Sequence, residues 1–206
     1  MRKDWIKKQK NDVYYKRAQK EGVRSRAAFK IRQIQSKFKI FNNAKRVLDL
    51  CCAPGSWIEE IRREFDNISV FGVDMAKINP IEGVIFIQGD ILDDSLMPQL
   101  TEHLSKGVDV VLSDCAPKFI GSKETDIARQ IFLIQRVFKI ASNFLNEGGN
   151  LVCKLFDGNY IPNLRSYLKQ NFEKIYLFKP EASRKRSPEL YFIGKNYNKS
   201  ELNFSF

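Results

Sequence analysis

Two charged residues lie where apolar runs of the chain end, and together they have the chemistry to take a proton from a hydroxyl group. Lys154 interrupts the run Leu151-Val-Cys-Lys-Leu-Phe156, and Asp114 directly follows the run Val110-Val-Leu-Ser113. A buried ammonium must be paired or neutral, and a neutral lysine can accept a proton. The aspartate would favour the charged ammonium, whereas burial opposes it. The alternative interpretation is a lysine whose ammonium reaches solvent at a strand end.

Small and acidic residues at the ends of other apolar runs indicate a cofactor site. Asp49-Leu-Cys-Cys-Ala-Pro-Gly-Ser-Trp57 contains a turn of small residues that would let a cofactor approach the backbone. It lacks the G-x-G-x-x-G pattern, and Pro54 removes an N–H group that a pyrophosphate would use. Asp74 is placed to accept hydrogen bonds from a ribose diol, and Asp90 to contact an adenine amino group. The alternatives are an ordinary strand–helix turn and a helix cap at Asp90.

The elements that must position these residues follow from the alternation of short apolar runs with helical stretches. We expect strands at residues 46–50, 69–73, 84–88, 108–113, 150–155, 175–178 and 190–194, and helices at 23–39, about 123–145 and 161–171. This order predicts an α/β fold with a mostly parallel sheet and helices on both faces. The loop 179–189 is short for a crossover, so the last two strands should form an antiparallel pair at the sheet edge.

The order of these elements also predicts where a ligand binds. Ligands of an open α/β sheet bind outside the carboxyl ends of its strands. If the fourth and fifth strands are neighbours, Asp114 and Lys154 lie side by side at that edge. The sequence therefore places the proton-transfer pair and the small-residue turn in one site.

The positive charge of the chain is concentrated at its N-terminus. Among 206 residues the net charge is +11, and residues 1–39 alone hold 14 Lys/Arg and three Asp/Glu. A neutral domain with a basic arm predicts a polyphosphate ligand such as nucleic acid, the alternative being a solvated charged segment. Trp5, Tyr14 and Tyr15 in this arm would either stack on bases or pack on the domain. A smaller basic group, Arg184-Lys-Arg186, lies near the C-terminus.

Length and composition limit the class of protein. The chain fits a single domain, residues 1–206, with residues 1–39 as a basic arm and helix. It has no apolar run long enough for a membrane helix and no apolar signal-peptide core at its start, so we expect a cytoplasmic protein without a membrane partner. Monomer is the default expectation.

The cysteines have no pattern typical of a metal site. Cys51 and Cys52 are adjacent, Cys115 and Cys153 are distant, and His103 is the single histidine. We therefore expect no metal, and four reduced, mostly buried thiols.

Taken together, the motifs resemble the FtsJ/RrmJ family of ribose 2′-O-methyltransferases. The resemblance runs from about Tyr14 to Gly194 and is carried by residues 24–30, 47–57, 81–90, 113–117, 147–154 and 183–189. It implies an enzyme that uses S-adenosylmethionine as its methyl donor. It also implies a Rossmann-like methyltransferase fold with a seven-stranded, mostly parallel sheet whose last strand is antiparallel. One departure is Cys-Ala-Pro-Gly-Ser-Trp, where bacterial members typically carry Ala-Ala-Pro-Gly-Gly-Trp.

The resemblance also assigns roles to individual residues. The family's Lys-Asp-Lys-Glu tetrad maps onto Lys30, Asp114, Lys154 and Glu189. Lys154 would be the proton acceptor, oriented by Asp114, while Lys30 and Glu189 would bracket the acceptor ribose. The cofactor contacts of the family map onto Gly55, Trp57, Asp74, Asp90 and Asp114.

The implied substrate is RNA. We expect contacts to its phosphates from Arg24, Arg26, Arg184, Lys185 and Arg186. The motifs favour a uridine of large-subunit ribosomal RNA, free or in the large ribosomal subunit, over the tRNA anticodon loop. Two other functions compete with this one. A nicotinamide-dependent oxidoreductase predicts a glycine-rich turn that is absent, and a non-catalytic RNA-binding assembly factor predicts a broken tetrad.

Overall fold

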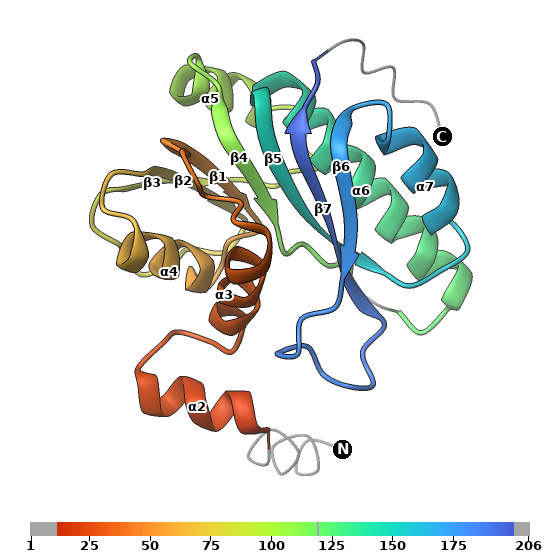
Figure 1. The fold of residues 1–206 in the computed structure, drawn as a ribbon, viewed down its shortest axis with the longest axis horizontal. Coiled ribbons are helices and arrows are strands. Elements are labelled where there is room, and N and C mark those ends of the chain that lie inside the picture. Colours follow the sequence, from red (N-terminus) through yellow and green to blue (C-terminus); the bar gives the residue numbers. More distant parts are fainter. Residues whose placement is uncertain (1–11, 119, 200–206) are drawn as a thin grey trace.

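A seven-stranded sheet forms the centre of the molecule in a computed structural model, which describes residues 12–118 and 120–199 (Figure 1). The strands are β1 (Arg46–Leu50), β2 (Ser69–Asp74), β3 (Val84–Gln88), β4 (Val108–Ser113), β5 (Leu145–Phe156), β6 (Phe172–Phe178) and β7 (Glu189–Tyr197). Their order is β3-β2-β1-β4-β5-β7-β6. Strand β7 runs antiparallel to β5 and β6, and the other pairs are parallel.

Helices cover both faces of this sheet (Figure 1). They are α2 (Val13–Glu21), α3 (Ala27–Phe38), α4 (Ser56–Glu64), α5 (Leu96–Leu104), α6 (Lys123–Phe144) and α7 (Ile161–Leu168). Successive strand residues point to opposite faces. On β5, Val152 joins the core under α3 and α4, whereas Leu151 and Cys153 join the core under α5, α6 and α7. Because both faces are buried, the central strands are apolar almost throughout.

The structure confirms the predicted fold class and differs from the predictions at several element boundaries. The expected helix at 23–39 begins at Ala27, and a separate helix, α2, precedes it. Gly22 causes the break: it has a φ of 67°, and its N–H bonds the carbonyls of Ala18 and Gln19, which ends α2. Strand β5 begins at Leu145, earlier than expected, with a register shift against β4. The antiparallel pair is present, with β7 inserted between β5 and β6.

The expectation of four reduced thiols is wrong for two of them. Cys51 and Cys115 form a disulfide with a Cα–Cα distance of 5.2 Å. Leu50 of β1 pairs with Ser113 of β4, so the residues just beyond these two strands are brought together at the sheet edge. Cys52 and Cys153 are free and buried, as expected.

The described part of the chain contains neither a membrane-spanning helix nor a metal-binding cluster. No helix of residues 12–118 and 120–199 is long and apolar enough to cross a bilayer. The same residues contain no cluster of His, Cys, Asp and Glu side chains arranged to hold a metal ion.

Candidate active site

Strand register brings three members of the predicted tetrad to one edge of the sheet. Ser113 of β4 pairs with Cys153 of β5, so Asp114 and Lys154 are the next residues of neighbouring parallel strands. On the other side of β5, Lys154 is opposite Tyr191 of β7, and Phe156 is opposite Glu189. Glu189 and Tyr191 are two residues apart on one strand and therefore lie on the same face as Lys154.

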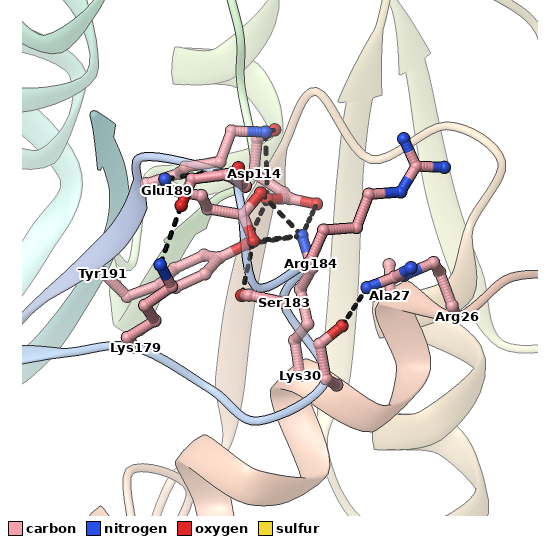
Figure 2. Close-up of polar contacts among 12 residues, drawn as sticks. Arg26, Ala27, Lys30, Asp114, Lys179, Ser183, Arg184, Glu189 and Tyr191 are labelled. Carbon is pink, nitrogen blue, oxygen red and sulfur yellow. Dashed lines mark hydrogen bonds and ion pairs between the residues drawn. The ribbon is translucent and has the colours of Figure 1, made fainter. Parts of the chain in front are cut away.

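The fourth member, Lys30, reaches this face from helix α3 (Figure 2). Its ammonium nitrogen lies 2.8 Å from Oε1 of Glu189 and 3.8 Å from Oδ2 of Asp114. The ammonium of Lys154 lies 3.1 Å from Oδ1 of Asp114 and donates to the Asp114 carbonyl at 2.5 Å. Both lysines are buried, and each ammonium is paired with a carboxylate. The four side chains form one cluster of two positive and two negative charges.

Tyr191 joins the two halves of this cluster and was not among the residues predicted from the sequence. Its hydroxyl accepts a hydrogen bond from Lys30 at 3.0 Å and donates one to Oδ1 of Asp114 at 2.5 Å (Figure 2). The ring is fully buried and lies against Trp57, with 5.9 Å between centroids. The sequence did contain a signal: Tyr191 is two positions after Glu189 in a strand, so both side chains must point to the same face.

The charges set the protonation of the central groups. Burial alone would raise the pKa of Asp114, but the ammonium groups of Lys154 and Lys30 and the Tyr191 hydroxyl outweigh it and lower that pKa. Burial, followed by the neighbouring carboxylates of Asp114 and Glu189, raises the pKa of Tyr191 well above its usual range. Asp114 is therefore an ionised acceptor and Tyr191 a neutral donor.

A cavity of about 260 Å³ opens beside the cluster. It is lined by Lys30 and Glu189 together with Ser25, Arg26, Ala27, Arg184 and Ser187. Ser183 donates a hydrogen bond to Oε1 of Glu189 at 2.6 Å, which fixes that carboxylate at the cavity wall. A small polar group entering this cavity would therefore meet an ammonium and a carboxylate side by side.

The small-residue turn and two acids lie at the neighbouring strand ends. Asp74 ends β2, and its two carboxylate oxygens accept from the backbone N–H groups of Ala53 and Ala76, each at 2.8 Å. Gly55 has a φ of 96°, and a Cβ there would lie 3.2 Å from Ile81. Asp90 does not cap α5 directly; its carboxylate accepts from the N–H of Leu92 in a local turn. Asp74, at the end of the adjacent strand β2, therefore holds the turn in place through Ala53.

Trp57 lies in the first turn of α4, directly after the small-residue turn. Its side chain is buried in the core between α4 and the sheet, and its indole N–H donates to the Ala27 carbonyl at 2.9 Å. This contact ties α4 to the first turn of α3, the helix that carries Lys30. Its side chain therefore serves to position elements of the site.

Asp49 is a further acid that the predictions left without a role. It lies on β1 directly before the turn, is 1% exposed, and neither carboxyl oxygen has a hydrogen-bond partner in residues 12–118 and 120–199. Burial, together with the charges of Asp114 and Asp74, raises its pKa well above the usual range. Asp49 is therefore a neutral carboxylic acid on β1, the strand that leads into the turn.

The predicted RNA-contacting residues fall into two groups. Arg24 and Arg26 are occupied within the protein: Arg24 donates to the carbonyls of Pro54 and Asn79 at 3.0 and 3.1 Å, and Arg26 bonds Asp12 and the Ala182 carbonyl. Their contacts hold the N-terminal segment against the turn and against the β6–β7 loop. Arg184, Lys185 and Arg186 are exposed on that loop beside the cavity. Trp5 lies outside the described residues.

Comparisons with known proteins agree with this architecture. The family model described as "FtsJ-like methyltransferase" matches residues 23–197. A Methanocaldococcus jannaschii protein named ribosomal RNA large subunit methyltransferase E is 42% identical over 95% of this chain and 82% of its own length. A protein of the same name from Zymomonas mobilis is 39% identical over 94% of this chain and 87% of its own length.

A solved structure gives the same result for the fold. The crystal structure of a ribosomal RNA methyltransferase from Plasmodium falciparum superposes with a TM-score of 0.76 and 32% identity, covering 84% of this chain and 98% of that one. The family model, the relatives and the structural match all extend over most of the chain. The chain therefore belongs to the FtsJ-like methyltransferase family.

Proposed function

We propose that this methyltransferase transfers a methyl group from S-adenosylmethionine to a ribose 2′-hydroxyl of large-subunit ribosomal RNA. The observation that carries the proposal is the charged cluster of Lys30, Asp114, Lys154 and Glu189, in which both lysines are buried and paired with carboxylates. Two of its members, Lys30 and Glu189, line a 260 Å³ cavity. A weakly acidic hydroxyl needs a positioned base, and this cluster offers a lysine held by a carboxylate. The names of the relatives support ribosomal RNA as the substrate.

The residues at the strand ends fit S-adenosylmethionine. Asp74 fixes the turn and keeps a carboxylate at the end of β2, where a ribose diol would be recognised. Gly55 keeps the turn free of a side chain. Asp49 lies on the strand that leads into the turn, and its buried carboxyl oxygens have no hydrogen-bond partner in residues 12–118 and 120–199. When bound, the cofactor supplies a methyl group on a sulfonium centre that needs no further activation.

The contacts within the cluster support a separate role for each of its residues. Lys154, once neutral, accepts the proton of the 2′-hydroxyl, and Asp114 stabilises the ammonium that results, at 3.1 Å. Lys30 and Glu189 line the cavity and hydrogen-bond the ribose. Holding the reacting oxygen in line supplies most of the rate enhancement, and the base adds roughly 10²- to 10⁴-fold. The exposed Arg184, Lys185 and Arg186 contact phosphates next to the acceptor nucleotide.

The test is transfer of labelled methyl groups from S-adenosylmethionine to isolated ribosomal subunits, ribosomal RNA and tRNA. Lys154→Met removes the base but keeps the length of the side chain, and Lys139→Met on the exposed side of α6 is the matched control. We expect label in large-subunit RNA that makes one dinucleotide resistant to alkali, a loss of at least 10²-fold in Lys154→Met, and full activity in Lys139→Met.

Other outcomes would redirect the proposal. Label in tRNA would keep the chemistry and replace the substrate. Label that leaves every dinucleotide sensitive to alkali would exclude the 2′-hydroxyl. Binding of cofactor and RNA without any transfer would favour a non-catalytic assembly factor.

A further inference from the structure

A second cleft lies along helix α3 and shares no lining residue with the active-site cavity. It has a volume of about 550 Å³, within the range of small-molecule sites. Helix α2 contributes Tyr14 and Arg17, helix α3 contributes Phe29 and Lys37, and the segment after β6 contributes Lys179. None of these residues belongs to the tetrad or to the cofactor turn.

One ridge separates this cleft from the active-site cavity. The β6–β7 loop crosses α3 at Ala182, whose N–H donates to Gln33 at 3.1 Å and whose carbonyl accepts from Arg26. Ala182 is fully buried by these contacts. Arg184 and Ser187 line the active-site cavity beyond the ridge, and Lys179 and Glu181 line the second cleft before it. An extended ligand strand that leaves the active-site cavity over this loop therefore enters the second cleft.

Cations and aromatic rings alternate along the cleft. The guanidinium groups of Arg17 and Arg32 lie 4.7 and 5.0 Å from the centre of the Phe29 ring, which also contacts Tyr14. At the other end, the ammonium of Lys37 lies 4.7 Å from the centre of the Phe178 ring. Basic grooves with aromatic platforms are typical of sites that bind single-stranded nucleic acid.

The cations differ in how much of their charge is already neutralised. Arg17 and Arg32 form ion pairs with Glu21, and Arg32 also bonds Glu60. Lys37 instead contacts aromatic rings, and Lys179 donates to backbone carbonyls, among them that of Ser187 at 2.8 Å. Neither ammonium forms an ion pair with a carboxylate of residues 12–118 or 120–199, although Glu181 also lines the cleft. Lys37 and Lys179 are also exposed, so a phosphate can reach them.

We propose that this cleft binds a single-stranded RNA segment next to the acceptor nucleotide, with phosphates on Lys37 and Lys179 and a base on Tyr14 or Phe178. The inference rests on the proposed RNA substrate and adds a second, separate contact to it. Lys30 and Lys37 are seven positions apart on α3, about 10 Å along the helix axis. The two sites are therefore close enough for one RNA chain to occupy both.

The experiment compares two double charge reversals in the full chain. Lys37→Glu with Lys179→Glu alters the cleft, and Lys106→Glu with Lys169→Glu makes the same change in charge at exposed positions near the ends of α5 and α7. Each protein is titrated with a short RNA that fills only the acceptor site and with a longer single-stranded RNA. Both titrations are repeated over a range of salt concentrations, and methyl transfer is measured on the same RNAs.

We expect the cleft variant to bind the longer RNA at least roughly tenfold more weakly and to lose about 1.4 from its log–log salt slope, the value for two phosphate contacts on a single strand. Binding of the short RNA and of S-adenosylmethionine should match the control variant, and KM for the longer RNA should rise while kcat is unchanged. Equal affinity of the two variants for the longer RNA would refute RNA binding in the cleft and leave the proposed function standing. Binding of an acidic peptide, but not of RNA, to the cleft would also refute it.

Failure of the proposed function gives a different pattern. If the wild-type chain binds the longer RNA through Lys37 and Lys179 but transfers no methyl group, the cleft is supported and the enzyme activity is not. If the wild-type chain binds neither RNA, both proposals fall.

Discussion

The hydroxyl group of Tyr191 offers the sharpest test of how the active site is held together. Tyr191→Phe removes one oxygen atom from a fully buried side chain and leaves the ring against Trp57. That oxygen accepts from Lys30 at 3.0 Å and donates to Asp114 at 2.5 Å. The substitution therefore breaks the hydrogen-bonded link between the two lysine–carboxylate pairs without removing a charge, and it leaves the 3.8 Å ion pair of Lys30 with Asp114.

The size of the effect follows from the contacts that remain. A hydrogen bond to a charged group contributes about 1.5–3 kcal/mol, so two of them set an upper range of about 3–6 kcal/mol. Lys30 keeps Glu189 at 2.8 Å, and Asp114 keeps Lys154 at 3.1 Å, so neither charge is left unpaired. We therefore expect the free energy of unfolding to fall by about 2–3 kcal/mol. We also expect kcat to fall about 10- to 100-fold, since roughly 1.4–2.8 kcal/mol of positioning is lost at the reacting groups.

Urea unfolding and single-turnover methyl transfer, both well below the melting temperature, measure the two effects separately. Tyr176→Phe on β6 is the control, because its side chain is 40% exposed and outside the cluster; both quantities should be unchanged. Wild-type kcat in Tyr191→Phe would show that the link contributes only to stability. An unfolding free energy within about 0.5 kcal/mol of wild type would refute the assigned hydrogen bonds altogether.

Two further predictions concern buried groups beside the cofactor turn. Because burial raises the folded-state pKa of Asp49, its contribution to stability is complete below the unfolded pKa of about 3.9 and is lost as pH rises toward the folded pKa. The free energy of unfolding of the wild type should thus fall by about 1.4 kcal/mol per pH unit relative to Asp49→Asn across that window, and parallel profiles in urea unfolding would contradict this. The Cys51–Cys115 disulfide closes a loop with a sequence separation of 64, worth about 4 kcal/mol. Reduction should lower the free energy of unfolding of the wild type by about that amount and leave that of Cys51→Ser unchanged. A wild-type free energy of unfolding that does not respond to reductant would argue against the disulfide.

Local pattern was enough to predict most of the fold. The apolar runs that end at Leu50 and Ser113 coincide with the ends of β1 and β4, because a strand buried on both faces must be apolar along its length. The short loop before Glu189 correctly indicated an antiparallel strand. Helix α2 was not predicted, because its sequence is mostly polar and Ala18 is its one buried residue, and the helix expected at 23–39 begins only at Ala27.

Only part of the site could be predicted from the sequence. Asp114 and Lys154 were predicted from their places at the strand ends, and Lys30 and Glu189 through the resemblance of the motifs. The structure brings all four together. The part played by Trp57 and the internal contacts of Arg24 were not foreseen. A motif preserves residue type and order, but it does not say whether a side chain turns toward the ligand or toward the core.

The sequence by itself therefore determined most of the elements, their boundaries to within about five residues, and the chemistry available at the strand ends. Only the tertiary structure decided that Cys51 meets Cys115, that Tyr191 lies between Lys30 and Asp114, and that the β6–β7 loop divides two clefts. The physical reason is the range of the interactions. Hydrophobic periodicity and turn chemistry act within a few residues, whereas strand order and register depend on packing between segments up to about 160 positions apart, such as Lys30 and Tyr191.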